Sequence, residues 1–476
     1  MPMQADVIII GAGPGGYRAA SHAAQHQLKV VIFEQGHVGG TCLNEGCIPT
    51  KAYARNAEAL TLVRQAADFG ISCGAPTFSL ETACSRKDEV IGSLREGIET
   101  LLAHPNITLV RAEARFVDAH TVEACHGDDG DTAAEGERYT APHIIVATGS
   151  VPKRLRVPGA ELTIDSSDLL QLGRLPEHLC IIGAGVIGME FASIFSAFGT
   201  KVTVVEFLKE CLPAIDSDIA KRMRKALEKQ GVEFCLQCGV TGVERKVESG
   251  EWKVESGERK VESGEWKVVT FQDKKGREQS VEADVVLMAV GRAPRVFDHF
   301  SRAGFDYDER SGIHVDDHCQ TTVEGIYAIG DVNGRQMLAH AAEMQGIHVV
   351  NRILGHDDDI DLSIMPAAVF TSPEVAGVGK TEDQLKQEGT PYECRKAFHR
   401  ANGKALAMGQ AEGMLKLLSE PGAGRILGCH AFGAHSADLI QEASALMCRS
   451  TTVAQLRHIV HIHPTLSEIL LAAAEA

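Results

Sequence analysis

One unit of sequence, present twice, constrains the fold of this chain more than any other feature. The first copy, VIIIGAGPGGYRAASHAAQHQLKVVIFE, covers residues 7–34, and the second, LCIIGAGVIGMEFASIFSAFGTKVTVVE, covers residues 179–206. Each predicts a buried strand (Val7–Ile10 and Leu179–Ile182), a glycine turn, a helix and a second strand that ends in a glutamate. The spacing from first glycine to glutamate is identical, since 34 − 11 = 23 and 206 − 183 = 23. This order of elements indicates an α/β fold with two parallel sheets.

The residue types in both copies indicate dinucleotide binding. The glycines permit a tight turn and the close approach of a pyrophosphate to the helix N-terminus, and the glutamate accepts hydrogen bonds from a ribose hydroxyl. Ordinary strand–turn–helix packing is the alternative, but both copies have the complete strand, helix and acid context. No arginine lies beside the second glutamate, in VVEFLK, which favours NAD over NADP there. The residues concerned are Gly11, Gly13, Gly16 and Glu34 in the first copy, and Gly183, Gly185, Gly188 and Glu206 in the second.

Composition excludes several other classes of protein. At 476 residues the chain is too long for one core, and its net charge of −17 argues against general nucleic-acid binding. No signal peptide pattern opens the chain, and no apolar run approaches the roughly 20 residues that span a bilayer. We therefore expect a cytoplasmic protein, or one of an organelle matrix if a leader was removed. Thirteen scattered cysteines do not form a secreted disulfide framework.

Two of these cysteines, Cys42 and Cys47 in GGTCLNEGCIPTKA, need a separate explanation. A zinc site needs about four ligands, and no second suitable cluster is present. Inert buried thiols are the other alternative, but the pair follows Glu34 by eight residues (42 − 34), which favours redox activity. In a regular helix the two Cα atoms would lie roughly 8–9 Å apart, whereas a disulfide needs less than about 7 Å. We therefore expect the chain to leave regular helix in this segment, which Gly46 and Pro49 allow.

The segment GGTCLNEGCIPTK resembles the active-site segment of the class I pyridine nucleotide-disulfide oxidoreductases, and the resemblance spans nearly the whole chain. It implies two cofactors, FAD and NAD. It also implies that Cys42 exchanges with a disulfide substrate, and that Cys47 lies under the flavin as the charge-transfer thiolate. Lys51, beside the flavin, is then expected to pair with Glu190.

Further cofactor contacts follow from the same resemblance. The segments IIVATGS (residues 144–150) and TTVEGIYAIGDVNGRQMLAHAA (residues 321–342) resemble the family's flavin-binding motifs, in which an aspartate placed like Asp331 holds the ribityl and phosphate portion of FAD. The flavin residues implied are Thr41, Lys51, Ala114, Thr148, Gly149, Asp331 and Ala339, and those near NAD are Glu190, Val240 and Gly291.

The C-terminal segment HIVHIHPTLSEIL (residues 458–470) narrows the choice within the family. His463 and Glu468 resemble the family's His–Glu dyad, in which the histidine is the base and acts from the other protomer of a homodimer. The wording HPTLSE is most similar to the dihydrolipoamide-oxidising branch, whose partners are lipoyl domains or the peripheral-subunit-binding domain of multienzyme complexes. A glutathione- or mercuric-reductase-like enzyme, a diaphorase or a non-catalytic scaffold are the alternatives. Alternation predicts His461 and His463 on one strand face, as a surface pair or a poor two-ligand metal site, and we expect no metal. We also hypothesise a cis bond before Pro464.

We expect two Rossmann-like dinucleotide-binding domains and a C-terminal α+β dimerisation domain. The predicted regions are an FAD domain at 1–153, an NAD domain at 154–289, a central segment at 290–356 that completes the FAD site, and an interface domain at 357–476.

Two further motifs receive structural interpretations. The segment KVESGEWKVESGERKVESGEWKV (residues 246–268) repeats every seven residues, but one aliphatic residue per unit and Ser-Gly exclude a coiled coil. We expect two units inserted into a β-hairpin, which lengthen it or hang loose. The pair Cys235 and Cys238 in CLQC falls in a strand pattern, where residues three apart face opposite sides, and we expect it to be structural.

Overall fold

The computed structural model describes residues 2–126, 136–247 and 265–476. Within this part of the chain no helix is long and apolar enough to cross a membrane. The chain forms two compact units, each described by itself below. The first unit comprises Met1–Ala52, Cys84–Lys153 and Arg292–Leu362, and the second comprises Tyr53–Ala83, Arg154–Gly291 and Ser363–Ala476.

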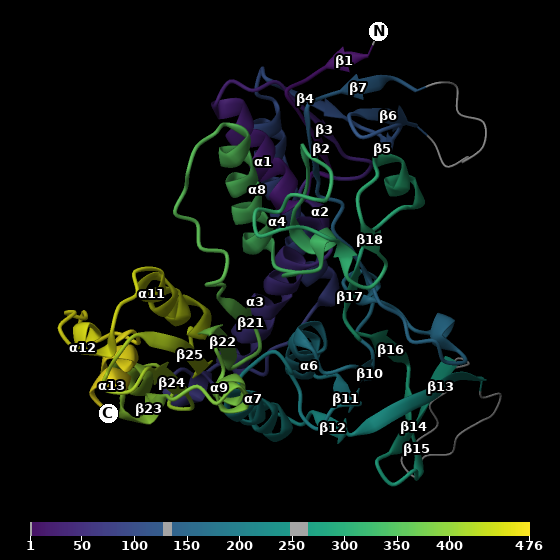
Figure 1. Ribbon diagram of the computed structural model, residues 1–476. Coiled ribbons are helices and arrows are strands. Elements are labelled where there is room, and N and C mark those ends of the chain that lie inside the picture. Colours follow the sequence, from purple (N-terminus) through teal and green to yellow (C-terminus); the bar gives the residue numbers. More distant parts are fainter. Residues whose placement is uncertain (1, 127–135, 248–264) are drawn as a thin grey trace. The chain divides into compact units, whose positions relative to one another are not determined.

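The first unit is built on a parallel sheet of five strands in the order β20-β8-β2-β3-β4. Of these strands β2, β3 and β20 are fully buried apolar runs, as expected for a parallel sheet that is covered on both faces. Helix α1 (Pro14–Gln25) packs directly beside α8 (Ala339–Ile353), as Figure 1 shows. Their close approach requires glycine, because a Cβ on Gly346 would lie 2.8 Å from the Gly15 carbonyl oxygen. The strands are β2 (Val7–Ile10), β3 (Val30–Phe33), β4 (Ile107–Val110), β8 (His143–Val146) and β20 (Ile326–Ala328).

A second sheet of the first unit has the order β1-β7-β6-β5. Its buried side chains join those of the parallel sheet in one apolar cluster that includes Phe33, Phe116 and Phe300. The remaining elements of this unit are β1 (Met3–Gln4), α2 (Gly40–Asn44), β5 (Glu113–Phe116), β6 (Thr121–Cys125), β7 (Arg138–Thr140), β9 (Ser150–Pro152), β17 (Arg292–Pro294), β18 (Tyr307–Asp308) and β19 (Gly312–Ile313). Helix α3 (Cys47–Arg64) begins in the first unit and continues into the second after Ala52. Most of helix α4 (Leu80–Leu102) belongs to the first unit, which resumes at Cys84.

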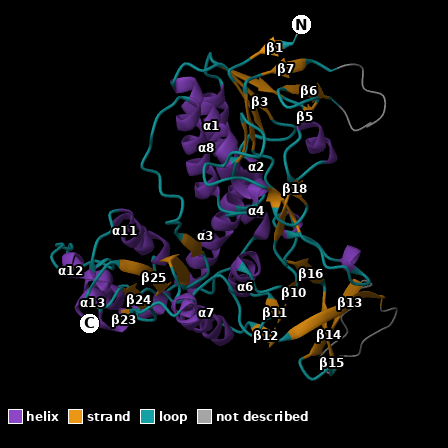
Figure 2. Cartoon of the chain, viewed as in Figure 1, coloured by secondary structure: helices purple, strands orange, loops and turns teal. Residues whose placement is uncertain are grey.

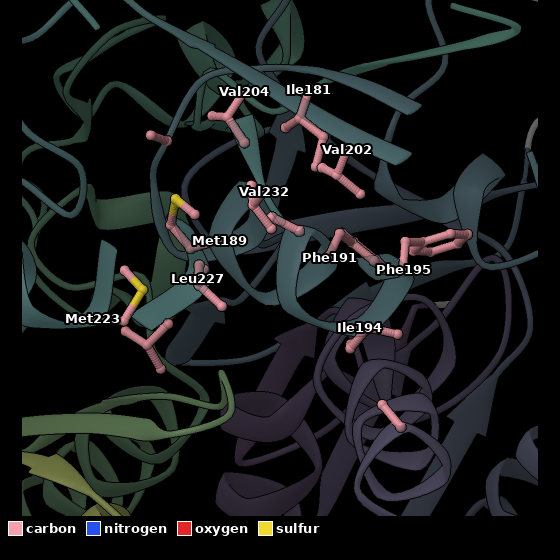
Figure 3. Packing of buried hydrophobic residues seen from close by; sticks show 14 of the residues in the cluster. Ile181, Met189, Phe191, Ile194, Phe195, Val202, Val204, Met223, Leu227 and Val232 are labelled. Carbon is pink, nitrogen blue, oxygen red and sulfur yellow. The ribbon is translucent and has the colours of Figure 1, made fainter. Parts of the chain in front are cut away.

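The second unit repeats the dinucleotide-binding architecture with a parallel sheet in the order β12-β11-β10-β16. Figure 3 shows side chains of this core, where Phe191, Ile194 and Phe195 come from α6 (Val186–Phe198). Full burial of each such side chain contributes roughly 1.5–3 kcal/mol. The other elements of this part are α5 (Ser166–Leu169), β10 (His178–Ile182), β11 (Lys201–Glu206), α7 (Ser217–Lys229), β12 (Glu233–Leu236) and β16 (Val285–Met288). Two dinucleotide-binding sheets in one α/β chain confirm the predicted fold class.

An antiparallel sheet of three strands follows β12, drawn in orange in Figure 2. It consists of β13 (Cys238–Val247), β14 (Glu265–Asp273) and β15 (Glu278–Ala283). Val247 pairs with Glu265, so the ends of the segment with the seven-residue repeat belong to a β-hairpin, as expected. Residues 248–264 of the repeat lie outside the described residues.

The C-terminal part of the second unit is an antiparallel sheet in the order β21-β22-β25-β24-β23, with helices packed on it. A buried lysine joins it to the start of α7, since Lys416 Nζ lies 2.8 Å from the buried Asp216 Oδ1 and 2.5 Å from Oε2 of the partly exposed Glu382. The elements are β21 (Ala367–Val369), β22 (Glu374–Gly379), α9 (Glu382–Glu388), β23 (Glu393–Phe398), α10 (Gly403–Ala407), β24 (Met414–Ser419), β25 (Ile426–Gly433), α11 (Ser436–Cys448), α12 (Val453–Leu456) and α13 (Glu468–Glu475). The boundaries of the four predicted regions stay predictions.

Candidate functional site

The three glycines of the first copy differ in their surroundings. Gly11 has a φ of +105°, and a Cβ there would lie 2.4 Å from the Ala147 carbonyl oxygen. A Cβ on Gly16 would lie 1.9 Å from the Gly11 oxygen, so this position also requires glycine. In contrast, a Cβ on Gly13 would meet nothing closer than 3.9 Å. The first and third glycines therefore shape the turn, and the second leaves space beside it for a ligand.

The second copy has the same geometry. Gly183 has a φ of +104°, and a Cβ on Gly188 would lie 2.2 Å from the Gly183 oxygen. A Cβ on Gly185 would meet no atom within 4 Å. The identical assignment of roles in two places supports the prediction of two dinucleotide sites.

The two glutamates also have matching contacts. Glu34 accepts the backbone N–H of Ala12 and of Gly36, both at 2.9 Å. Glu206 accepts the N–H of Ala184 at 2.5 Å and of Leu208 at 2.7 Å. Each carboxylate is thus fixed against its own glycine turn, at the carboxyl end of the sheet where a ribose would lie.

Helices α1 and α6, which follow the two glycine turns, have no side-chain cap at their N-termini. The same is true of α8, which begins at Ala339. The first N–H groups of a helix need acceptors, and a phosphate can supply them. In the first unit, the uncapped starts of α1 and α8 and the open space at Gly13 and Gly149 fit FAD. In the second unit, the uncapped start of α6 and the open space at Gly185 and Gly291 fit NAD.

Asp331 is held in a network within the first unit. Ser150 Oγ donates to Asp331 Oδ2 at 2.5 Å, and Arg292 Nε donates to Ser150 Oγ at 2.7 Å. Burial raises the pKa of the Asp331 carboxyl above its usual value, although the Ser150 hydrogen bond and the charge of Arg292 oppose this. Thr148 and Gly149 are fixed beside it, because Thr148 Oγ1 donates to the Arg295 oxygen at 2.8 Å. The motif residues of the predicted ribityl site therefore lie together.

The remaining predicted cofactor residues have varied surroundings. Thr41 is exposed on α2, Ala114 is buried on β5, and Ala339 is the first residue of α8. Val240 lies on β13, outside the parallel sheet, and Gly291 has a φ of +103°.

The helix breaks between the two cysteines, as the sequence predicted. Cys42 lies in α2, which ends at Asn44, and Cys47 is the first residue of α3. A Cβ on Gly46 would lie 3.0 Å from the Thr41 oxygen, so glycine suits this tight connection. Both cysteines are free thiols, and a hydrogen bond between Cys42 and Cys47, together with burial, raises the pKa of the Cys42 thiol well above its usual value. The charge of Lys51 acts in the opposite direction. The two sulfurs are therefore close enough to interact.

Lys51 and Glu190 belong to different compact units, and the ion pair between them stays a prediction. Glu190 is 4% exposed and accepts the N–H of Phe370 at 2.9 Å within the second unit.

His463 and Glu468 form the predicted dyad in the second unit. His463 Nδ1 lies 2.9 Å from Glu468 Oε1, and the other carboxylate oxygen accepts the N–H of Thr465 at 2.9 Å. That backbone contact and the contact with His463 lower the pKa of the Glu468 carboxyl. The His463 side chain is 79% exposed, so its Nε2 edge faces outward. The peptide bond before Pro464 is cis, which confirms the hypothesis for this position.

Two predictions of strand structure were wrong. Residues 457–467 form no strand, and His461 and His463 do not share a face, because the side chain of His461 is 4% exposed and contacts Glu442. The CLQC segment is divided between β12 and β13, since Gln237 has a φ of +57° and interrupts the extended chain. Both of its cysteines are free thiols. Among the residues the structure describes, no group of three metal-ligating side chains is arranged to hold a metal ion.

Sequence analysis missed several polar residues around these sites. Tyr17 Oη donates to Glu343 Oε1 at 3.2 Å, and the charge of Glu343 contributes to the raised pKa of Cys42. Asn402 Nδ2 donates to the Thr465 oxygen at 3.0 Å, next to the His463 dyad. These pairs are distant in sequence and follow no period, so only the fold brings them together.

Two dinucleotide-binding sheets, a paired dithiol and a histidine–carboxylate dyad define the class of flavin- and NAD-dependent disulfide oxidoreductases. Comparison with known families agrees, because the profile of the pyridine nucleotide-disulphide oxidoreductases matches residues 5–346 and that of their dimerisation domain matches residues 365–474. The chain belongs to this family. It is an NAD-dependent flavoprotein disulfide oxidoreductase with FAD and NAD as cofactors, and its dimerisation domain supports a homodimer.

Similar proteins cover the whole chain. The dihydrolipoyl dehydrogenase of Cupriavidus necator is 38% identical over 491 residues, which span 100% of this chain and 98% of the relative. That of Geobacillus stearothermophilus is 35% identical and covers 99% of this chain and 96% of its own length. Among solved structures, the Cu(II) complex of the HOCl-induced flavoprotein disulfide reductase RclA from Escherichia coli has a TM-score of 0.83 at 28% identity, with 99% of both chains covered.

Proposed function

We propose that this chain is a dihydrolipoyl dehydrogenase, which oxidises protein-bound dihydrolipoamide to lipoamide and reduces NAD⁺. The observation that carries the proposal is the interacting pair Cys42 and Cys47, in the same compact unit as the glycine turn and the Asp331 network. Full-length similarity to dihydrolipoyl dehydrogenases supports the choice of substrate. A glutamate at the second glycine turn, Glu206, would repel a 2′-phosphate, which supports NAD⁺ as the acceptor.

The sulfur chemistry follows from the exposed base and the dithiol. His463, oriented by Glu468, removes a proton from one dihydrolipoyl thiol. The resulting thiolate attacks Cys42 Sγ of the oxidised pair, the Cys42–Cys47 bond breaks, and Cys47 leaves as a thiolate. The second substrate thiol then attacks the first substrate sulfur, and its proton passes to the departing sulfur of Cys42, so that Cys42 is released as a thiol and lipoamide forms. Two electrons have moved from the substrate dithiol to the enzyme pair.

The cofactors complete the reaction. Gly11, Gly13, Gly16, Glu34 and Asp331 would hold FAD, and the matching glycines with Glu206 would hold NAD. Bound FAD supplies a two-electron acceptor that passes the electrons to NAD⁺ as a hydride.

We also propose that His463 acts across the interface of a homodimer, on the dithiol of the other protomer. Val460 and Ile462, beside it in sequence, are 94% and 78% exposed, as expected for apolar side chains that a second protomer covers. The proposed partners beyond the homodimer are lipoyl domains or the peripheral-subunit-binding domain of a 2-oxo acid dehydrogenase or glycine cleavage complex.

NAD⁺ reduction by dihydrolipoamide tests the proposal. The purified protein should be yellow and should reduce NAD⁺ with dihydrolipoamide far faster than it reduces glutathione disulfide with NADH or NADPH. Cys42→Ser should abolish this activity while FAD stays bound. A protein that binds no flavin, or one that prefers a different disulfide, would contradict the proposal.

A further inference from the structure

Two histidines of one loop have opposite environments. The side chain of His461 is 4% exposed, whereas that of His463 is 79% exposed. Val460 and Ile462, on either side of His461, are also exposed. His461 is therefore the residue by which this part of the loop inserts into the body of the protein.

Both nitrogens of the His461 ring are hydrogen-bonded to acceptors. Nδ1 lies 3.0 Å from the Ile459 carbonyl oxygen, and Nε2 lies 2.9 Å from Glu442 Oε1. A carbonyl oxygen can only accept, so Nδ1 donates to the Ile459 oxygen, and the contact of Nε2 with the Glu442 carboxyl holds the other edge of the ring. The ring is therefore fixed at both of its nitrogens.

Glu442 provides a firm attachment point. It lies on α11, whose residues Leu439, Ile440 and Ala443 are buried against the C-terminal sheet. On the other side of His463, the Thr465 carbonyl oxygen accepts the side-chain N–H of Asn402 at 3.0 Å. The loop is thus attached to the body of the second unit both before and after the exposed histidine.

We propose that His461 and Glu442 form a positioning pair, which fixes the loop so that His463 Nε2 is presented to the substrate thiol. This inference rests on the proposed role of His463 as the base. The pair does not itself touch the substrate. Its geometry matters because displacement of a catalytic group by about 1 Å can cost on the order of 100-fold in rate. The charge of His461 also helps to keep Glu468 ionised, after the larger effects of the Thr465 N–H and of His463.

The test compares two substitutions of Glu442 in the full-length holoenzyme. Glu442→Leu removes the acceptor and the charge, and Glu442→Gln keeps an oxygen that can accept from the ring. Asp438→Asn is the matched control, since Asp438 is on the same helix and its side chain is 86% exposed. Two activities are measured for each, namely NAD⁺ reduction by dihydrolipoamide and NADH oxidation by ferricyanide, which takes electrons without the base.

We expect Glu442→Leu to lower kcat for dihydrolipoamide by on the order of tenfold or more, with ferricyanide reduction and KM for NAD⁺ within twofold of the unchanged enzyme. Glu442→Gln should lie between, and Asp438→Asn should have no effect. Equal losses in both activities, or a Glu442→Leu enzyme within twofold of the control, would overturn the positioning role. His463→Gln, assayed in parallel, separates the two levels of the argument. If His463→Gln keeps its dihydrolipoamide activity, the proposed base and the positioning pair are both wrong. If His463→Gln loses this activity while Glu442→Leu keeps it, only the positioning pair is wrong.

Discussion

Replacement of Glu468 by glutamine should damage catalysis more than its removal does. The two carboxylate oxygens have separate partners, the His463 ring at 2.9 Å and the Thr465 N–H at 2.9 Å. Glutamine has only one acceptor oxygen, and the Thr465 N–H requires it. The amide NH₂ then faces His463 Nδ1 and donates to it, which leaves the proton of the neutral ring on Nε2. The ring nitrogen that should accept the substrate proton is then already protonated.

The size of this effect follows from the role of a general base, which contributes typically 10²–10⁴-fold to rate. We expect Glu468→Gln to lower kcat for dihydrolipoamide oxidation by about 10³-fold, equivalent to about 4 kcal/mol of barrier at 1.36 kcal/mol per decade. Glu468→Ala leaves the ring free to adopt either tautomer, so its loss should be several-fold smaller. Because the pKa of Glu468 is lowered, its carboxylate stays ionised at pH values where an ordinary glutamate begins to take up a proton. Protonation of Glu468 should therefore not set the acidic limit of activity in the unchanged enzyme.

The assay is steady-state NAD⁺ reduction by dihydrolipoamide from pH 5.5 to 9, with NADH–ferricyanide activity as the control. Both variants should keep the control activity. A Glu468→Gln enzyme that is as active as Glu468→Ala, or that retains a third of the original turnover, would refute the tautomer argument.

Three other predictions concern binding and stability. Gly185→Ala should fold normally and raise KM for NAD⁺, because the new methyl group meets no protein atom within 4 Å. Gly188→Ala should instead lower the thermal unfolding temperature, because its methyl group would lie 2.2 Å from a carbonyl oxygen. Lys416→Met should destabilise the fold by about 3–5 kcal/mol in urea unfolding, because it leaves a fully buried carboxylate without a counter-ion, while Lys396→Met, at a partly exposed pair, should cost less than about 1 kcal/mol. Burial lowers the pKa of His299 to about 4, so the unfolded chain binds the extra proton and stability should fall as pH drops from about 6.5 to about 4. His299→Gln should remove about 1 kcal/mol of the loss between pH 7 and pH 5, allowing for partial exposure, as urea midpoints at these two pH values would show.

Local sequence was sufficient for the features that depend on backbone geometry. The strand Val7–Ile10 was predicted with its observed limits, because a run of aliphatic residues before a glycine turn has few alternatives. The helix break between Cys42 and Cys47 followed from the distance that a disulfide permits. The matching positions of Glu34 and Glu206 followed from spacing alone. For the strand and the two glutamates the determining contacts lie within one strand–helix–strand unit, and for the cysteines they lie in the short connection between α2 and α3.

The loop at residues 458–467 shows where this approach failed. Alternation of apolar and histidine residues predicted a strand, but strand preference mainly measures packing against a pleated surface. Here Val460 is 94% exposed, and residues 457–467 form no strand. The contact that fixes the loop joins His461 to a glutamate on a separate helix, 19 residues earlier. Neither the period of the sequence nor a short motif encodes that distance.

The HIH motif contains both the proposed general base, His463, and a second histidine, His461, that has a different environment. HIH places two imidazoles two residues apart, and sequence treats them alike. The fold separates them by burial: the first has acceptors at both nitrogens and no free edge, and the second has one acceptor at Nδ1 and an exposed Nε2. Only a ring with a free edge can exchange a proton with a substrate. The division of labour between His461 and His463 therefore arises from the helix that supplies Glu442, and a change at Glu442 should reach the chemistry without touching any reacting atom.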